Sequence, residues 1–323
     1  MSVKNINWGI IGCGDVAEIK SGPAFQKVEN SALISVMRRN KEKAKDFAKR
    51  HNVAHWTSNA IDIINHKDIN AVYIATPPSS HLEYALKAIE ANKHVYLEKP
   101  MVLNSKEASI LSKAVKKGNT KVTVAHYRRK LPNFIAVKEM LEAELIGDVT
   151  HAMLTISQSK KANLITKTAV NWRVNPEISG GGYFHDIAPH QIDLMYYYFG
   201  DIDTMKGIDI ENYKRSKDVV KGEIQFKNGV QFKGSWNFNA STDIDNCTIY
   251  GEYGTISFSF YGNEIKVTLE EHTQTYTFNN PKHVQQPLIE KTVAYFLGDT
   301  SNPCSIEEGV VVTQVMDTFC GIK

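Results

Sequence analysis

One stretch near the start of the chain constrains its fold more than any other: Trp8-Gly9-Ile10-Ile11-Gly12-Cys13-Gly14-Asp15-Val16-Ala17. The apolar run 6–11 predicts a buried parallel strand, and a helical pattern follows it. Gly12 permits a tight turn, and Gly14 has no Cβ, so a pyrophosphate can lie against the backbone. Ala17 stands where a third glycine often keeps helix and strand close. Strand, glycine turn and helix N-terminus together favour a dinucleotide-binding loop over an ordinary strand-to-helix turn, with cofactor contacts from Gly12, Cys13, Gly14, Asp15 and Val16.

From residue 5 to about residue 124, strand-like and helical patterns alternate. We expect strands over 6–11, 32–37, 71–75, 94–97 and 121–125, and helices near 41–51, 60–65, 82–91 and 106–117. This alternation predicts a Rossmann-type α/β domain, a parallel sheet with helices on both faces. Ligands of such sheets bind at the carboxyl ends of the strands, so residues that follow each strand are informative.

Two arginines follow the second expected strand, about 20 residues beyond the glycines, where an acidic residue would bind a ribose 2′-hydroxyl. Arg38 and Arg39 would instead bind a 2′-phosphate through paired, charged hydrogen bonds. The sequence therefore predicts NADP as the cofactor, with NAD possible. The alternative is a pair of solvated arginines at a helix entry.

Two further loops follow strands of the expected sheet. Thr76-Pro77-Pro78-Ser79-Ser80-His81 contains prolines that break the strand, and Ser79 or Ser80 can cap the next helix. In Glu98-Lys99-Pro100 the proline ends a strand and places Lys99 at the carboxyl edge, where a buried lysine can donate to a substrate oxygen. The alternatives are a capped loop and an exposed surface lysine. Predicted cofactor contacts are Thr76, Pro77, Pro78, His81, Glu98 and Lys99.

After about residue 126 the alternation stops. A helix is expected over 133–145, ended by Gly147, and strands in series over 149–157, 218–226, 230–237, 245–250, 254–260, 264–269 and 273–278. Strands in series predict an open, mainly antiparallel sheet and therefore an α+β domain. We expect a nucleotide-binding domain over 1–124 and a substrate-binding and oligomerisation domain over 125–323, whose closing helices, near 284–296 and 305–319, pack the tail on the body.

The second half also contains Gly180-Gly181-Gly182-Tyr183-Phe184-His185-Asp186-Ile187-Ala188-Pro189-His190. Asp186 and His190 are four residues apart, so on a helix they share one face. A carboxylate beside an imidazole fixes its tautomer and raises its basicity, which would let His190 accept a hydroxyl proton; Lys99 is the alternative acceptor of that proton. The alternatives are a structural contact or a metal site that includes His185. Adjacent side chains point to different helix faces and no further histidine is near, so no metal is expected.

These motifs together resemble the Gfo/Idh/MocA family of sugar and polyol oxidoreductases. The matching segments are 12–17, Ala75-Thr76-Pro77-Pro78-Ser79-Ser80-His81, Glu98-Lys99-Pro100, Asn171-Trp172-Arg173 and 180–190. The resemblance covers essentially the whole chain and implies Lys99, Asp186 and His190 as the catalytic group. Two departures are Arg38, in place of the acidic residue of NAD-using members, and Ala188-Pro189, in place of a glycine and its neighbour.

The resemblance also implies which residues bind substrate. The segment His126-Tyr127-Arg128-Arg129 follows the last parallel strand, and Tyr127 or Arg128 is expected in the pocket, with Arg129 at a charged helix entry. Trp172 offers a flat apolar face to a sugar ring, and Arg173 offers a fork to its hydroxyls. The expected substrate contacts are Lys99, Tyr127, Trp172, Arg173, Asp186 and His190.

Composition narrows the function further. The 323 residues carry a net charge of only +3, which argues against nucleic acid or a membrane as partner. The four cysteines are scattered, which fits a reducing compartment. With no signal-like start and no apolar run of about 18 residues, a cytoplasmic protein is expected. The resemblance implies a homodimer or homotetramer formed through the C-terminal sheet.

The sequence as a whole predicts an NADP-dependent oxidoreductase acting on CH–OH groups. It would transfer hydride between nicotinamide and a sugar, polyol or related hydroxy-carbonyl compound. The alternatives are an NAD-dependent glycosidase of the same fold and a non-catalytic cofactor-binding protein.

Overall fold

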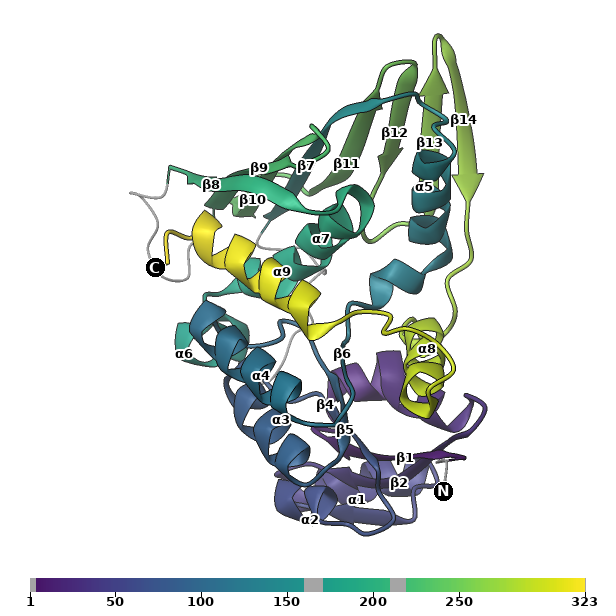
Figure 1. Cartoon of the computed structure of the whole chain (residues 1–323), viewed down its shortest axis with the longest axis vertical. Helices are drawn as coiled ribbons and strands as arrows, with labels where there is room; N and C mark the ends of the chain where they lie inside the picture. The colour runs from purple at the N-terminus through teal and green to yellow at the C-terminus, as the bar shows by residue number, and fades with distance from the viewer. Residues whose placement is uncertain (1–3, 160–170, 210–218, 323) are drawn as a thin grey trace. The chain divides into compact units, whose positions relative to one another are not determined.

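The structure is a computed structural model that describes residues 4–159, 171–209 and 219–322. The chain forms two compact units (Figure 1). Unit 1 comprises Met1–Tyr127 and Pro281–Thr313, and unit 2 comprises Arg128–Asn280 and Gln314–Lys323. The first boundary therefore follows Tyr127 rather than residue 124, and the segment 281–313, expected in the second domain, belongs to unit 1.

Unit 1 contains a six-stranded parallel sheet in the order β3-β2-β1-β4-β5-β6. The strands are β1 (Ile6–Ile11), β2 (Ser31–Met37), β3 (His55–Thr57), β4 (Ala71–Ile74), β5 (His94–Leu97) and β6 (Val122–Val124). The expected strands are confirmed. The sequence does not predict β3, because its three edge residues form no buried apolar run. The strand order reverses between β1 and β4, which is where such sheets bind ligands.

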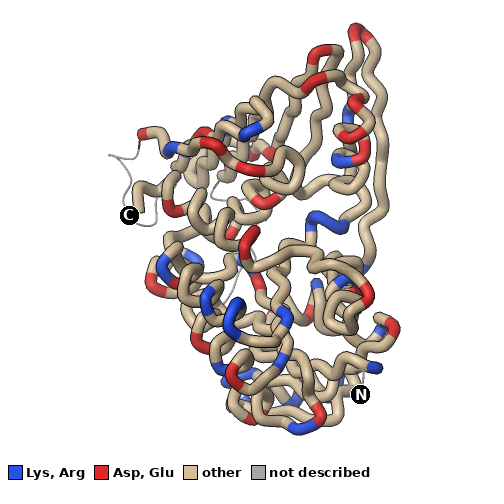
Figure 2. The backbone as a smooth tube through the Cα atoms, in the orientation of Figure 1, with Lys and Arg blue, Asp and Glu red and all other residues tan. Residues whose placement is uncertain are grey.

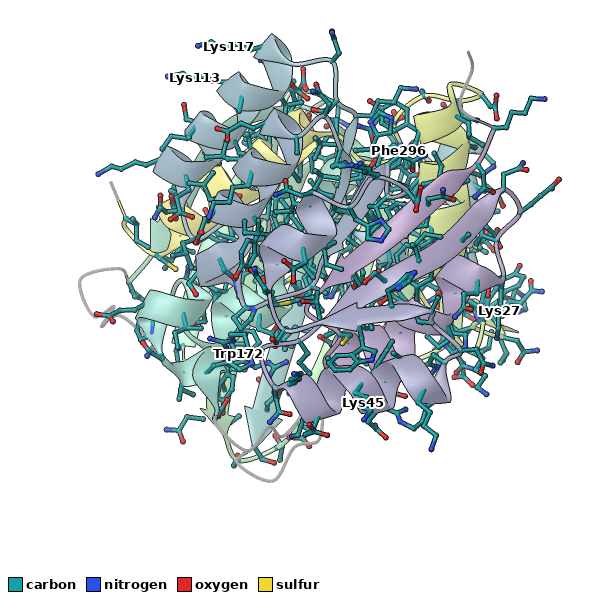
Figure 3. All side chains as sticks on the ribbon, turned by 90° about the horizontal axis from the view of Figure 1, so that it is seen from below. Lys27, Lys45, Lys113, Lys117, Trp172 and Phe296 are labelled. Atoms are coloured by element: carbon teal, nitrogen blue, oxygen red, sulfur yellow. The ribbon has the colours of Figure 1, made fainter. Side chains whose placement is uncertain are left out.

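The helices of unit 1 begin at asparagine caps in three cases. They are α1 (Lys41–Arg50), α2 (Ala60–Ile64), α3 (His81–Glu90) and α4 (Ser105–Lys117). The side chains of Asn40, Asn59 and Asn104 accept bonds from the first turns of α1, α2 and α4, which satisfies N–H groups there. Lys113 and Lys117 project outward from α4 (Figure 3), as the polar face of an amphipathic helix should.

The segment after the glycine turn differs from the helix that its pattern predicts. A π-helical turn, η1 (Ala17–Ser21), is followed by a 3-10 helix, η2 (Gly22–Gln26). Pro23 has no N–H to donate, and Gly22 packs so closely that a Cβ would lie 2.5 Å from the carbonyl oxygen of Ala17. A regular α-helix therefore does not continue through this segment.

Two helices follow Asn280 in sequence, and the second of them continues from unit 1 into the last segment of unit 2. They are α8 (Gln286–Leu297) and α9 (Ile306–Phe319), close to the predicted ranges. In unit 1 the Phe296 ring of α8 (Figure 3) lies 5.6 Å from the Trp8 ring of β1. The start of α9 also packs here, since a Cβ on Gly309 would lie 2.7 Å from the Met101 sulfur.

Unit 2 contains an eight-stranded sheet in the order β14-β13-β12-β11-β7-β10-β9-β8. The strands are β7 (Val149–Ser159), β8 (Ile202–Ile208), β9 (Val219–Phe226), β10 (Gln231–Ala240), β11 (Ile244–Gly251), β12 (Gly254–Phe258), β13 (Glu264–Leu269) and β14 (His272–Thr277). All neighbours are antiparallel except β7 and β10. The predicted mainly antiparallel sheet is confirmed, and β8 is an additional, half-exposed edge strand.

The inner face of this sheet packs on α7 (Tyr183–Phe199) and α5 (Pro132–Glu142). Trp236 of β10 contacts the Phe184 ring at 5.1 Å and donates to Gln191 Oε1 at 3.3 Å. The prediction that the helix over 133–145 ends at Gly147 is wrong, because α5 ends at Glu142. Gly147 instead has a φ of +70° and lies in a turn against Tyr253, where a side chain does not fit.

Charged residues of both signs occur in both units (Figure 2). Among the helices described, none combines the length and the apolar character that crossing a membrane requires.

Candidate active site

The glycine turn after β1 has the shape that a dinucleotide requires. Gly12 has a φ of +101°, and a Cβ there would lie 2.8 Å from backbone atoms of Ala75 and Thr76. No residue but glycine fits this position without strain. A Cβ placed on Gly14 would have no neighbouring atom within 4 Å, so the backbone there faces open space. The turn therefore fits a pyrophosphate, which the open side of Gly14 would receive.

The residues around this turn differ in how deeply they are buried. Cys13 and Ala17 are fully buried, Val16 is half-buried and Asp15 is exposed. Burial raises the pKa of the Cys13 thiol to about 11, so the thiol is neutral near pH 7. The Cys13 side chain is therefore unreactive and contributes only packing. What the residue can offer to a ligand is its backbone.

Arg38 lies beside the glycine turn. Its Nη1 donates to the Cys13 carbonyl oxygen at 3.4 Å, and the residue is half-buried, whereas Arg39 is exposed. A guanidinium is thus placed at the end of β2, next to the dinucleotide turn. Lys41 adds a second cation to this end of the sheet, with its Nζ 5.9 Å from the centre of the Trp56 ring.

The loop after β4 is tied to the loop after β5 by one histidine. His81 is completely buried, with Nε2 2.7 Å from Thr76 O and Nδ1 3.0 Å from Pro100 O. Burial lowers the pKa of His81. Its imidazole therefore joins the two loops from inside the fold.

The predicted serine cap is wrong, because Ser80 Oγ instead donates to Thr76 Oγ1 at 2.8 Å and to Pro77 O at 3.0 Å. Pro78 begins a 3-10 turn, η3 (Pro78–Ser80), so the loop closes on itself before α3 starts. These bonds fix Thr76 and Pro77 at the carboxyl end of β4.

The Glu98-Lys99-Pro100 segment follows β5, and its Lys99–Pro100 peptide bond is cis. Glu98 is 5% exposed, and its carboxylate accepts from Tyr73 Oη at 2.6 Å and from Lys99 N at 3.2 Å. The Glu98 side chain is therefore held inside unit 1, while Lys99 is half-buried. Glu98 positions the backbone from which the lysine side chain starts.

The segment after β6 departs from the prediction at Arg129. Expected at a charged helix entry, it is 1% exposed, and its Nε and Nη2 form a fork on the Asp193 carboxylate at 2.8–3.1 Å. Arg128 is also buried, donates to Phe260 O and lies 4.6 Å from the centre of the Tyr261 ring. Tyr127 belongs to unit 1 and is 4% exposed.

In unit 2 the Trp-Arg element meets the aspartate of α7. Arg173 Nε donates to Asp186 Oδ2 at 2.7 Å, and its guanidinium lies 4.5 Å from the centre of the Trp172 ring. Trp172 is half-buried in a 3-10 turn, η5 (Trp172–Val174). Arg173, predicted to bind substrate hydroxyls, thus fixes the carboxylate of Asp186.

The glycine run positions the start of α7. Ser179 Oγ accepts from the N–H groups of Gly181 and Gly182, and a Cβ on Gly181 would lie 2.2 Å from the His185 ring. His185 is fully buried, which lowers its pKa to about 4. Its imidazole is therefore neutral near pH 7 and acts as a packing group behind the helix start.

The predicted residues fall on both units. Gly12, Arg38, Thr76, His81, Glu98 and Lys99 belong to unit 1; Trp172, Arg173, Asp186 and His190 belong to unit 2. His190 is 3% exposed and lies one turn after Asp186 on α7. Within the described ranges, no three His, Cys, Asp or Glu side chains gather in a way that could hold a metal ion.

Sequence reasoning missed three residues of these sets. Asp193 lies three residues after His190 and therefore shares the helix face of Asp186 and His190, which helix periodicity could have indicated. Tyr73 lies in the apolar strand β4, where its sequence context suggests only a core residue. Gln285 lies far along the chain, in a segment without a motif.

Comparison with known proteins agrees with this geometry. Residues 6–126 match a model described as an oxidoreductase family with an NAD-binding Rossmann fold, and residues 134–257 match the GFO/IDH/MocA C-terminal domain. The chain is 62% identical over 316 residues to oxidoreductase P35 of Formosa agariphila, covering 98% of each chain. It is 30% identical over 213 residues to a levoglucosan dehydrogenase of Pseudarthrobacter phenanthrenivorans, covering 64% of this chain and 54% of the relative. A solved levoglucosan dehydrogenase, in complex with NADH and levoglucosan, superimposes with a TM-score of 0.86 at 23% identity, covering 98% of this chain and 97% of that one.

The match to an NAD-binding oxidoreductase family and the similarity to named dehydrogenases show that the protein is an NAD(P)-dependent oxidoreductase. The chain belongs to the Gfo/Idh/MocA oxidoreductase family.

Proposed function

We propose that this oxidoreductase prefers NADP and transfers hydride between the nicotinamide and a sugar, polyol or related hydroxy-carbonyl compound. The observation that carries the cofactor preference is the Arg38 guanidinium at the glycine turn. An acidic residue here would bind a ribose 2′-hydroxyl and repel a 2′-phosphate, whereas an arginine fork binds that phosphate.

The residues that would hold the cofactor all belong to unit 1. The glycine turn would bind the pyrophosphate. Arg38 and Arg39 would bind the 2′-phosphate. The loops joined by His81 would border the nicotinamide ribose. The predicted contacts are Gly12, Cys13, Gly14, Asp15, Val16, Arg38, Arg39, Thr76, Pro77, Pro78, His81, Glu98 and Lys99.

When bound, the nicotinamide supplies the hydride acceptor for oxidation and the donor for reduction. In the proposed reaction, the Lys99 ammonium holds the substrate oxygen and stabilises the charge that develops on it. His190 takes the hydroxyl proton during oxidation and returns it during reduction. Asp186, fixed by Arg173, orients His190 or accepts from a second substrate hydroxyl.

A polyhydroxylated substrate fits the polar groups of unit 2. Trp172 presents an aromatic face, and the Arg173–Asp186 pair is neutral as a whole, so it does not demand an acidic substrate. Relatives are named for levoglucosan, 1,5-anhydro-D-fructose and scyllo-inositol, which supports this substrate class. Tyr127 completes the proposed set of substrate contacts.

A homodimer or homotetramer formed through the sheet of unit 2 is part of the proposal. Strand register places the exposed side chains of Met153, Val219 and Ile244 on the same face of the sheet. Exposed apolar side chains on one sheet face suit contact with a second copy. Light scattering of the purified protein would measure the oligomeric state directly.

A panel of sugars, inositols, anhydrosugars and deoxy-ketoses, followed by NADPH absorbance, tests the reaction. We expect turnover with at least one neutral polyol or its ketone, at a higher kcat/KM with NADPH than with NADH. Lys99→Ala and His190→Ala should each lower kcat by at least about 100-fold. Unchanged turnover in both variants would refute the catalytic assignment.

A further inference from the structure

Glu98 is the end of a buried hydrogen-bond chain that starts far along the sequence. Gln285 Nε2 donates to Glu98 Oε1 at 2.5 Å, and Gln285 Oε1 accepts from Tyr96 Oη at 3.1 Å. Gln285 is 0% exposed. A buried carboxylate needs such donors, because it has lost its hydration.

The segment around Gln285 also contacts η1, the helical turn that follows the glycine loop. Gln285 N donates to Lys20 O at 3.2 Å, and His283 Nδ1 lies 3.1 Å from Ile19 O. Ser21, at the end of η1, donates to Tyr73 Oη at 3.0 Å, and Tyr73 in turn donates to Glu98. Two separate paths therefore join η1 to Glu98, and one of them passes through Gln285.

We propose that Gln285 is a positioning residue for the reaction: its amide fixes the Glu98 carboxylate and thereby the backbone from which Lys99 reaches the substrate oxygen. The proposal rests on the proposed function for the role of Lys99. Gln285 acts through Glu98, whose second oxygen accepts from Lys99 N. No step of the chemistry passes through the glutamine itself.

The conservative variant Gln285→Glu makes the proposal testable by pH. When protonated, the introduced carboxyl can donate to Glu98 as the amide does; when ionised, it faces a like charge. Such a pair shares one proton, so the variant should lose the contact as pH rises. Tyr73 and Tyr96, which face the same site, have pKa values raised well above the usual range by burial, and burial lowers the pKa of His81. Lys99 lies next to Glu98 and is present in every variant.

The experiment compares kcat on the best substrate from pH 5.5 to 9 for wild type, Gln285→Leu, Gln285→Glu and the control Gln286→Leu. Gln286 is the matched control, since its amide bonds to exposed Glu290 instead. At every pH we expect about a tenfold loss of kcat for Gln285→Leu, the factor for one lost buried hydrogen bond. Gln285→Glu should stay within about threefold of wild type at low pH and fall about tenfold toward pH 9.

A second measurement needs no turnover. In the cofactor-free protein, the acylation rate of Lys99 by an amine-reactive ester is read by peptide mass spectrometry, with Lys113, exposed on α4, as internal standard (Figure 3). In Gln285→Leu the Glu98-Lys99-Pro100 segment is no longer held, so the labelling rate of Lys99 should rise about threefold while that of Lys113 stays unchanged. An inactive wild type with this labelling change would refute the proposed function and retain the positioning role. Unchanged labelling, or a Gln285→Leu variant that keeps wild-type kcat, would overturn the role of Gln285.

Discussion

Two glycines of one turn have different physical roles. Gly12 is required by the protein itself, because its φ of +101° and the nearby Ala75 backbone leave no room for a side chain. A Cβ on Gly14 would meet no atom within 4 Å, so the packing of the protein does not require a glycine there. Under the proposed function, the pyrophosphate of the cofactor is what would require a glycine at this helix start.

This distinction predicts opposite results for two alanine substitutions. Gly12→Ala should lower the free energy of unfolding by about 2 kcal/mol or more, because the backbone is strained and the new Cβ collides. Gly14→Ala should change it by less than about 0.5 kcal/mol, yet raise the Kd for NADPH at least about tenfold. Urea unfolding and fluorescence titration measure the two quantities. Equal NADPH affinity for wild type and Gly14→Ala would exclude the open side of Gly14 as the phosphate site.

Arg38 should determine whether the enzyme prefers NADPH or NADH. Arg38→Asp should lower kcat/KM for NADPH by about 100-fold, because a charged, forked hydrogen bond is lost and a repulsion added. The same variant should gain activity with NADH, and Arg39→Ala, at an exposed position, should have a smaller effect. Steady-state kinetics with both cofactors tests this. A wild type that prefers NADH would contradict the assignment of Arg38.

At the scale of one element, α7 carries a row of acidic and basic groups on one face. Asp186, His190 and Asp193 are spaced by four and three residues, and arginines from outside the helix hold the first and the last. His190 lies between these two anchored turns. The turns of α7 before and after His190 are therefore each anchored by an ion pair.

The pair between Arg129 and Asp193 should be costly to break. Both side chains are 1% exposed, so Arg129→Met removes the guanidinium fork from a buried carboxylate and should destabilise the protein by about 3–5 kcal/mol. The double variant Arg129→Met/Asp193→Leu should recover most of this loss. Lys138→Met breaks a more exposed pair with Glu142 and should cost less than about 1 kcal/mol. Urea unfolding compares the four proteins, and equal stability of Arg129→Met and Lys138→Met would contradict the buried-pair argument.

Local sequence explains most of what could be predicted. The backbone properties of Gly12 and Pro100 alone predict a tight turn and the end of a strand. Helix periodicity alone places Asp186 and His190 on one face. The partners of Glu98, Asp193 and Asp186 were not predictable, since Gln285, Arg129 and Arg173 reach these carboxylates from other segments. A glutamine without a motif gives no sign of a contact with a residue 187 positions away.

At the scale of the whole molecule, unit 1 is built from two separated pieces of the chain. The alternating pattern of the first piece predicts its parallel sheet, but Pro281–Thr313 has no strand of its own to reveal where it packs. Its assignment to unit 1 rests on side-chain contacts such as those of Gln285 with Tyr96 and of Phe296 with Trp8. Such contacts between distant residues are what a linear pattern does not contain.

Each unit also contains a histidine whose lowered pKa should make the protein sensitive to acid. Burial lowers the pKa of His94 in unit 1 and of His185 in unit 2 to about 4, below the usual value near 6.5. Between these pH values the unfolded chain binds more protons than the native one, so the free energy of unfolding falls as pH decreases. From pH 7.5 to 5, His185 should account for about 2 kcal/mol of that fall.

Urea unfolding at pH 7.5 and 5 tests this dependence with His185→Leu, which removes the titrating group and keeps an apolar side chain of similar size. The variant should lose less stability than wild type on acidification, by about 2 kcal/mol. His272→Gln, at an exposed position on β14, should follow the wild-type dependence. Parallel curves for wild type and His185→Leu would contradict the lowered pKa of His185, because they require this group to bind the same number of protons in the native and the unfolded chain at each pH.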